Sequence, residues 1–431
     1  KYKAASVSEG ERGCDCGGFE AFSDDIRCFM GNFTICSLKS TRDYSTFLKK
    51  VEKFLGDERI DIHFTSSSVY PSAIVPISGT IASLRAMGKN IHCHYSSGSY
   101  LSTIQFDSPY RVNDHTDSLA YPFSKIWHFT SFDEVTKLVN SYLDEISELV
   151  PCSTGLIEGL EWSLNETLDN VLQHALCNDG YMMGVVHKSK KYISFSIFDN
   201  GQGIYNSLRN SEYHPHSAID AISIAIQEGK TRDHNIGQGN GLWGLSNIVL
   251  ENHGRLGIRS HGSSLMIRAD GNIDKYENLP FLDTHHGTTT VDISFNYEQD
   301  ISLINALGGY TPSDLRFEDK LDDQNYLDFK VCDESTGFGT RIAGERLRNK
   351  VLNYLNRLDN PTKIKIDFSG ISIISSSFAD EFIGKLLAEL GFYKFTHVII
   401  LSGITPTIEA VINRSVCQRM AVLFNASSFS N

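Results

Sequence analysis

Three short phrases constrain this chain more than any other feature of its sequence. In chain order they are Glu166-Thr-Leu-Asp-Asn170-Val-Leu-Gln-His174, Asp199-Asn-Gly-Gln-Gly-Ile204 and Gly237-Gln-Gly-Asn-Gly-Leu242. In the first phrase Glu166, Asn170 and His174 recur every fourth residue, so a helix would direct all three polar side chains to one face. The two glycine-rich phrases predict turns whose backbone can approach a ligand and direct N–H groups at phosphate oxygens. Together the phrases predict a ligand site between a helix and two turns.

In this order the phrases resemble the three nucleotide-binding boxes of the GHKL (HATPase) fold, which histidine kinases and anti-sigma-factor serine kinases share. A fourth element agrees, because His286-Gly-Thr288-Thr-Thr290 precedes an apolar, strand-like segment, as a Gly-Thr pair precedes the last strand of that fold. The resemblance covers about residues 136–298. It implies a GHKL ATP-binding domain, which we place at residues 131–300.

The resemblance and simple ligand chemistry assign roles to these residues. Magnesium takes hard oxygen ligands, so the amide oxygen of Asn170 is a suitable ligand for Mg²⁺. Glu166 could orient or deprotonate the water that attacks the γ-phosphate. The resemblance implies that Asp199 accepts a hydrogen bond from the adenine amino group. The other expected nucleotide contacts are Gly201, Gly203, Lys230, Gly237, Gly239, Gly241, Leu242 and Thr288.

Each phrase taken alone has a simpler explanation. Asp199-Asn-Gly could be an ordinary hairpin turn, and a glycine cluster is more often a flexible loop than a phosphate cradle. Lys230 could lie in a solvated loop, and His174 could only finish a helix. Four phrases in the order of the family favour the nucleotide site over these explanations.

Strands and helices alternate from residue 325 onward, which predicts a parallel sheet with crossover helices. The passage from Ile366 to Asp380 resembles the STAS modules of anti-sigma-factor antagonists, and we place a STAS-like domain at residues 325–431 after a linker at 301–324. In that family a serine at a helix start can be phosphorylated, and Ser376 stands at the matching position. Ser375 and Phe378 replace the usual aspartate and glycine, so the serines could simply cap the helix.

A weaker repeat of this pattern precedes the ATP site. A shift of 304 residues places Phe64 on Phe368 and Ser72 on Ser376. We therefore predict a degenerate STAS-like domain at residues 41–130, after an N-terminal extension at 1–40. Pro71 falls on Ser375, which favours a docking surface over a phospho-acceptor.

Composition limits the classes of partner and compartment. The net charge of −13 argues against general nucleic-acid binding, because phosphate backbones require an excess of Lys and Arg. No apolar run is long enough for a membrane span, and scattered cysteines favour reduced thiols, so we expect a cytoplasmic protein. Zinc binding or free thiols both stay open for the N-terminal cysteines, which are Cys14, Cys16, Cys28 and Cys36.

These observations predict an α/β protein that binds ATP with magnesium, hydrolyses it, and couples nucleotide state to STAS-like domains that bind a protein partner. Two alternatives remain: a serine kinase acting on a STAS-domain serine, and a module that senses ATP without turnover. The sequence leaves open the partner, the biological process and the oligomeric state, including a homodimer.

Overall fold

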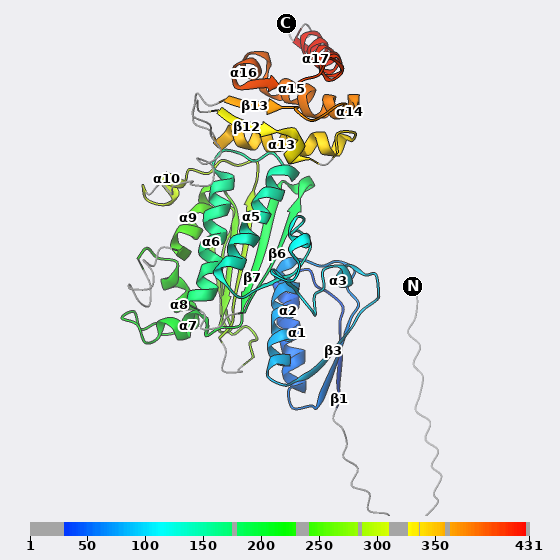
Figure 1. The fold of residues 1–431 in the computed structure, drawn as a ribbon. Coiled ribbons are helices and arrows are strands. Elements are labelled where there is room, and N and C mark those ends of the chain that lie inside the picture. The colour runs from blue at the N-terminus through cyan, green and yellow to red at the C-terminus, as the bar shows by residue number, and fades with distance from the viewer. Residues whose placement is uncertain are drawn as a thin grey trace, which may run out of the picture.

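The computed structural model describes residues 30–174, 179–229, 241–282, 287–309, 326–335, 337–357 and 363–427. Three sheets follow one another along the chain, and helices pack against each of them (Figure 1). The protein is therefore mixed α/β, as the sequence predicts. Among the described helices, none is long and apolar enough to cross a membrane.

The N-terminal domain is a parallel three-stranded sheet in the order β1-β2-β3 with two crossover helices. We predicted a domain start at residue 41, whereas the first strand of its sheet already begins at Met30. The first helix is amphipathic and begins with a capping box between Ser40 and Asp43. The second begins with Pro71, whose fixed φ suits a first helical turn, and is buried on almost every side. The elements are β1 (Met30–Ile35), α1 (Thr41–Phe54), β2 (Arg59–Phe64), α2 (Pro71–Ala86) and β3 (Asn90–His94).

The central domain is a mixed eight-stranded sheet in the order β10-β9-β8-β11-β7-β6-β5-β4. The edge strand β4 and its neighbour β5 lie within the range 41–130 that the sequence assigned to the preceding domain. The elements are α3 (Tyr100–Thr103), β4 (Tyr110–Arg111), α4 (Thr116–Leu119), β5 (Trp127–Phe129), α5 (Phe132–Leu149), α6 (Leu156–His174), β6 (Gly180–His187), η1 (Lys188–Lys190), β7 (Tyr192–Asp199), α7 (Gly203–Leu208), α8 (Ala218–Ala225), α9 (Gly241–Glu251), β8 (Arg255–Ser260), β9 (Ser263–Ile267), β10 (Ile273–Tyr276), β11 (Thr289–Asn296) and α10 (Leu303–Ala306).

Both faces of the central sheet are covered, and β7 shows how. Its residues alternate between the faces, so Phe195 joins the core beneath α5, α6 and α9, whereas Phe198 joins the core of the N-terminal domain. A Cβ on Gly79 of α2 would lie 2.2 Å from the ring of Phe198, so only glycine allows this approach. The N-terminal domain and the central sheet therefore share one continuous apolar core.

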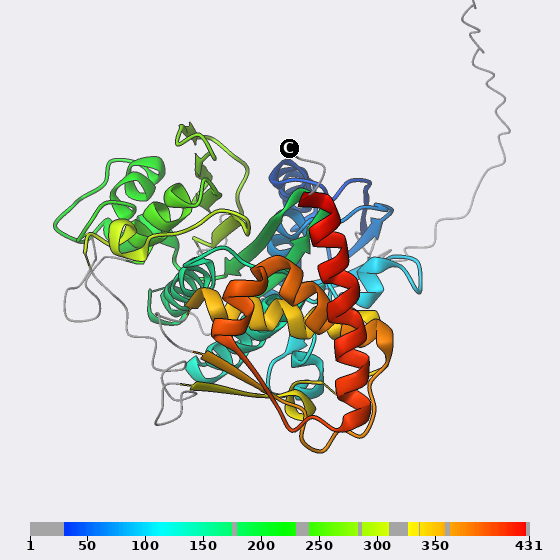
Figure 2. The same ribbon diagram turned by 90° about the horizontal axis from the view of Figure 1, so that it is seen from above.

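The C-terminal domain repeats the plan of the N-terminal one, with a parallel sheet in the order β12-β13-β14. The shift of 304 residues carries the start of α2, Pro71, onto Ser375, which directly precedes α14. The domain lies across the end of the central domain where α5 ends and α6 begins (Figures 1 and 2). The elements are β12 (Tyr326–Lys330), α12 (Val331–Glu334), α13 (Arg341–Arg357), β13 (Lys363–Asp367), α14 (Ser376–Ala379), the π-helical turn η2 (Asp380–Gly384), α15 (Lys385–Leu390), α16 (Phe392–Val398), β14 (Ile399–Ser402) and α17 (Pro406–Ser427).

Candidate nucleotide site

Two of the predicted helix residues meet the start of another helix. The leucines of α6 are buried against the sheet, whereas Glu166 and Asn170 are only partly buried. A Cβ built on Gly241, the first residue of α9, would lie 2.8 Å from Oε2 of Glu166 and 3.2 Å from Nδ2 of Asn170. Gly241 has no Cβ, so the N-terminal end of α9 lies close beside the polar residues of α6. The first N–H groups of a helix have no partner within it.

Asp199 ends β7 on the same sheet face as Phe195, which is the face that α6 covers. The side chain is buried, and its Oδ1 accepts a hydrogen bond of 2.9 Å from the backbone N–H of Gly201. Burial raises the pKa of Asp199 to about 6, and hydrogen bonds from Gly201 and Thr289 only partly offset this effect. Asp199 is thus a buried hydrogen-bond acceptor at the end of a strand, in apolar surroundings.

The glycine turn after Asp199 packs against the predicted Gly-Thr pair. The carbonyl of Gly201 accepts hydrogen bonds from the N–H groups of Gly287 at 2.8 Å and Thr288 at 3.2 Å. Gly203 and Thr288 both have positive φ, at 71° and 31°. The left-handed conformation explains glycine at the first position and strains threonine at the second.

Two residues that the sequence analysis missed hold these turns together. The Ser260 hydroxyl accepts a hydrogen bond from the N–H of Ile204 at 3.1 Å and donates one to the carbonyl of Thr288 at 3.0 Å. Nε2 of His261 lies 3.0 Å from Nδ2 of Asn206. Ser260 is the last residue of β8 and His261 follows it in the turn to β9, and no spacing in the sequence links these residues to the site.

The part of the site formed by α6 carries two acidic side chains, Glu166 and Asp169. Burial, and then the charge of Asp169 one turn away, raise the pKa of Glu166. Burial also raises the pKa of Asp169. A carboxylate with a raised pKa is a better proton acceptor, and two nearby carboxylates favour a divalent cation. Glu166 and Asp169 are therefore suited to accept a proton.

Several predicted residues lie outside the described residues, and others have structural roles. Lys230, Gly237, Gly239, Cys14, Cys16 and Cys28 are outside, and for His174 only the helical backbone is described. Leu242 packs at the edge of the central core. Cys36 is exposed and unbridged, and no group of three metal-binding side chains occurs among the described residues.

The C-terminal domain docks on the central domain through three asparagines of α13. Asn353 Nδ2 donates to the carbonyls of Ser147 at 3.0 Å and Val150 at 2.9 Å, and its Oδ1 accepts from the N–H of Cys152 at 2.6 Å. Asn349 and Asn356 donate to the carbonyls of Glu148 and Cys152 at 3.0 and 2.8 Å. The last carbonyls of a helix lack partners within it, so α13 caps the C-terminal end of α5.

An ion pair connects the same docking helix to α6. Nε of Arg357 lies 2.9 Å from Glu158, and Nη2 lies 3.6 Å from Glu161. Glu158 and Asn170 are about 18 Å apart along the axis at 1.5 Å per residue. One helix thus carries the docking contact near its start and the candidate nucleotide residues near its end.

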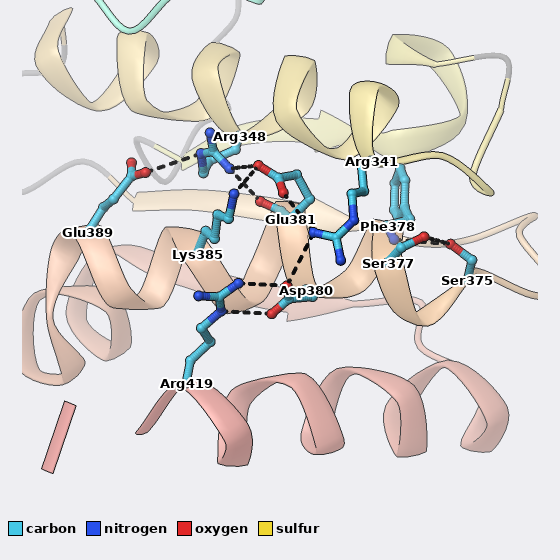
Figure 3. Close-up of polar contacts among 10 residues, drawn as sticks. All are labelled: Arg341, Arg348, Ser375, Ser377, Phe378, Asp380, Glu381, Lys385, Glu389 and Arg419. Carbon is cyan, nitrogen blue, oxygen red and sulfur yellow. Dashed lines mark hydrogen bonds and ion pairs between the residues drawn. The ribbon is translucent and has the colours of Figure 1, made fainter. Parts of the chain in front are cut away.

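The serine turn of the C-terminal domain is a helix cap (Figure 3). The Ser375 hydroxyl accepts a hydrogen bond of 3.0 Å from the N–H of Phe378, whose ring is buried in the core. Ser376 is exposed at the first position of α14. Further along the helix the two carboxylate oxygens of Asp380 accept hydrogen bonds from Nε and Nη2 of Arg419, at 2.8 and 2.7 Å. The turn is accessible, and its cap is complete without a phosphate.

Comparisons with known proteins bear mainly on this last domain. Residues 343–409 match a family model described as a STAS-like domain of unknown function (DUF4325). No curated protein matches the chain. A solved structure described as the crystal structure of ShkA full-length in complex with AMPPNP is similar at 10% identity and a TM-score of 0.20, over 88% of this chain and 72% of that chain. A TM-score this low supports no inference about this protein. The segment from α13 to β14 is therefore a STAS-like domain.

Proposed function

We propose that this protein binds ATP with magnesium in a GHKL-type site, hydrolyses it, and uses the nucleotide state to control its STAS-like domain. The observation that carries the proposal is the meeting of Glu166 and Asn170 with Gly241 at the start of α9. In the proposal, the metal ligand Asn170 and the general base Glu166 would then stand beside a helix N-terminus, where phosphate groups bind readily. The buried carboxylate of Asp199 lies on the same side of the sheet.

Each residue then has a distinct task. Asn170 would hold Mg²⁺, and Glu166 would orient or deprotonate the attacking water. Asp199 would accept a hydrogen bond from the adenine amino group, while Gly201, Gly203 and Thr288 shape the turns beside the base. The predicted contacts of Lys230, Gly237 and Gly239 with the phosphates belong to the proposal alone.

Coupling to the STAS-like domain would run through α6. A shift of Glu166 or Asn170 on nucleotide binding would move the whole helix, because α6 is a single rigid element of 19 residues. Glu158 and Glu161 would then change their contact with Arg357. The asparagine contacts of α13 with α5 are the interface that such a movement would tighten or release.

The test is titration of the purified chain with AMPPNP in millimolar magnesium. The Asp199→Asn variant should bind about tenfold more weakly or worse, because an amide can turn a donor toward the adenine amino group. Asp292→Asn is the matched control: Asp292 is also a carboxylate of the central sheet that burial holds at a pKa of about 6, but it lies outside the proposed site. If the unmodified chain binds no adenine nucleotide, the proposal fails.

A second candidate, a serine kinase acting on a STAS-domain serine, is favoured by the exposure of Ser376 at the start of α14. Within one chain the geometry opposes it. The transferred phosphate would lie beside Glu166 and Asn170, and Asn170 is about 18 Å along α6 from Glu158, which pairs with Arg357 of the STAS-like domain. Transfer would therefore require a second molecule.

A further inference from the structure

A groove of about 910 Å³ lies between the central domain and the STAS-like domain. One wall is formed by α5 and by the segment after α4, and the other by the start of α13 and the segment after α12. The groove continues from the docking interface, because Arg346 and Lys350 both line it and also pair with Glu148. A ligand in this interdomain groove would touch both domains at once.

Two large apolar side chains in the groove are open to solvent. Ile342 is 68% exposed and Tyr121 is 59% exposed. The guanidinium of Arg346 lies 5.7 Å from the centroid of the Tyr121 ring. Exposed groups of this size in a concave surface are typical of binding sites for a partner that supplies its own apolar side chain.

The charged side chains that line the groove indicate which charge the partner carries. Five acidic and three basic side chains line the groove, which gives a formal charge of −2. The cations Arg346 and Lys350 are already held by carboxylates of the same surface. A second copy of this chain, with its net charge of −13, is poorly matched to this surface, whereas a cationic peptide is well matched. The acidic lining residues are Asp144, Glu145, Glu148, Asp333 and Glu334.

We propose that the interdomain groove binds a peptide segment of a partner protein in which Lys or Arg stands beside an apolar side chain. The apolar side chain packs on Ile342 and Tyr121, and the cation lies near Asp333 and the carboxylates of α5. Because the bound segment bridges the two domains, it stabilises the docked arrangement of the STAS-like domain. This inference goes beyond ATP binding, and its test requires no nucleotide.

The experiment measures fluorescence anisotropy of a short labelled peptide of alternating leucine and lysine, added to the full chain without nucleotide. A second peptide carries glutamate in place of lysine. We expect binding of the lysine peptide only, weakened about tenfold by Ile342→Asn and about threefold by Asp333→Asn. Ile342 and Asp333 are both exposed, and circular dichroism checks that each variant is folded.

Two matched controls separate the groove from general attraction to an acidic protein. Ile373 is 66% exposed in the same domain but does not line the groove, and Ile373→Asn should leave affinity within about twofold. Asp328→Asn removes one exposed carboxylate elsewhere on that domain and should do the same. Equal affinity across all four variants, no binding of the lysine peptide, or equal binding of the glutamate peptide would overturn the proposal.

Discussion

Asp199 and Asp292 show how much the surroundings of a residue decide its chemistry. Both lie in the central sheet, and burial raises the pKa of each to about 6. Asp199 faces the side covered by α6, where the other candidate residues lie, while Asp292 is near the half-buried Arg259 on the side of the N-terminal domain. The same carboxyl group is thus a candidate ligand acceptor in one place and part of a domain contact in the other.

The raised pKa of Asp199 gives the proposed ATP site a pH dependence. Only the ionised carboxylate is a pure acceptor, so nucleotide affinity should be full above pH 6 and fall about tenfold per pH unit below it. The dissociation constant of AMPPNP, measured between about pH 5 and pH 8, checks this. Asp292→Asn should keep the profile and Asp199→Asn should flatten it. A profile that persists in the Asp199 variant would assign the titration to another group.

Glu166 separates binding from turnover. Glu166→Ala should leave the affinity for AMPPNP nearly unchanged while lowering phosphate release by about 10²-fold, the usual scale for a positioned general base. Asp169→Asn is the neighbouring control and should lower turnover much less. Equal losses of affinity and turnover in the Glu166 variant would mean that this residue supports the structure only, and unchanged turnover would place the base elsewhere.

At the scale of elements, periodicity and order in the sequence were more informative than single residues. The spacing of Glu166 and Asn170 predicted a helix that presents both, and the shift of 304 residues predicted the resemblance of α2 to the helix after Ser375. Contacts between segments that are distant in the chain could not be predicted from the sequence in this way. The hydroxyl of Ser260 forms hydrogen bonds with two different turns. In the sequence, the asparagines of α13 look like an ordinary solvent-exposed helix face, and only the structure shows that they contact the end of α5.

The cap of α14 bears on phosphorylation. We expect no label on Ser376 when the chain is incubated with γ-labelled ATP, because Ser375 already caps the helix and the proposed phosphate site lies about 18 Å along α6 from the docking contact at Glu158. Mass spectrometry and the Ser376→Ala variant check this outcome. Stoichiometric label that disappears in this variant would instead favour the serine kinase.

At the scale of the whole molecule, the two flanking domains are attached by opposite kinds of contact. The N-terminal domain shares an apolar core with the central sheet through α2 and Phe198. The STAS-like domain docks through asparagine side chains, backbone carbonyls and ion pairs. Polar contacts can be exchanged for water at low net cost, whereas separation of a shared core exposes apolar surface. Under the proposed function, the STAS-like domain is therefore the one that nucleotide binding would move.

Asn353 tests this difference. Asn353→Ala leaves the N–H of Cys152 and the carbonyls of Ser147 and Val150 without that partner, each at a cost of about 1–3 kcal/mol if it stays buried. Hydrogen exchange at residues 147–152 should become faster, and the radius of gyration should increase. Asn32→Ala, on the exposed face of β1, is the control and should change neither. Unchanged exchange in the Asn353 variant would show that the docking does not depend on this side chain.

The close packing of Gly79 against Phe198 also determines how the protein can be divided into fragments. A central domain produced without residues 30–95 would expose Tyr181, Met183 and Phe198, now buried beneath α2, along one face of its sheet. Such a fragment would be prone to aggregation, so loss of activity on deletion would say nothing about a separate task for the N-terminal domain. Boundaries that preserve each core run from β1 to α10 and from β12 onward. A deletion that separates α2 from β7 would therefore report whether the remaining fragment folds, and not what the N-terminal domain does.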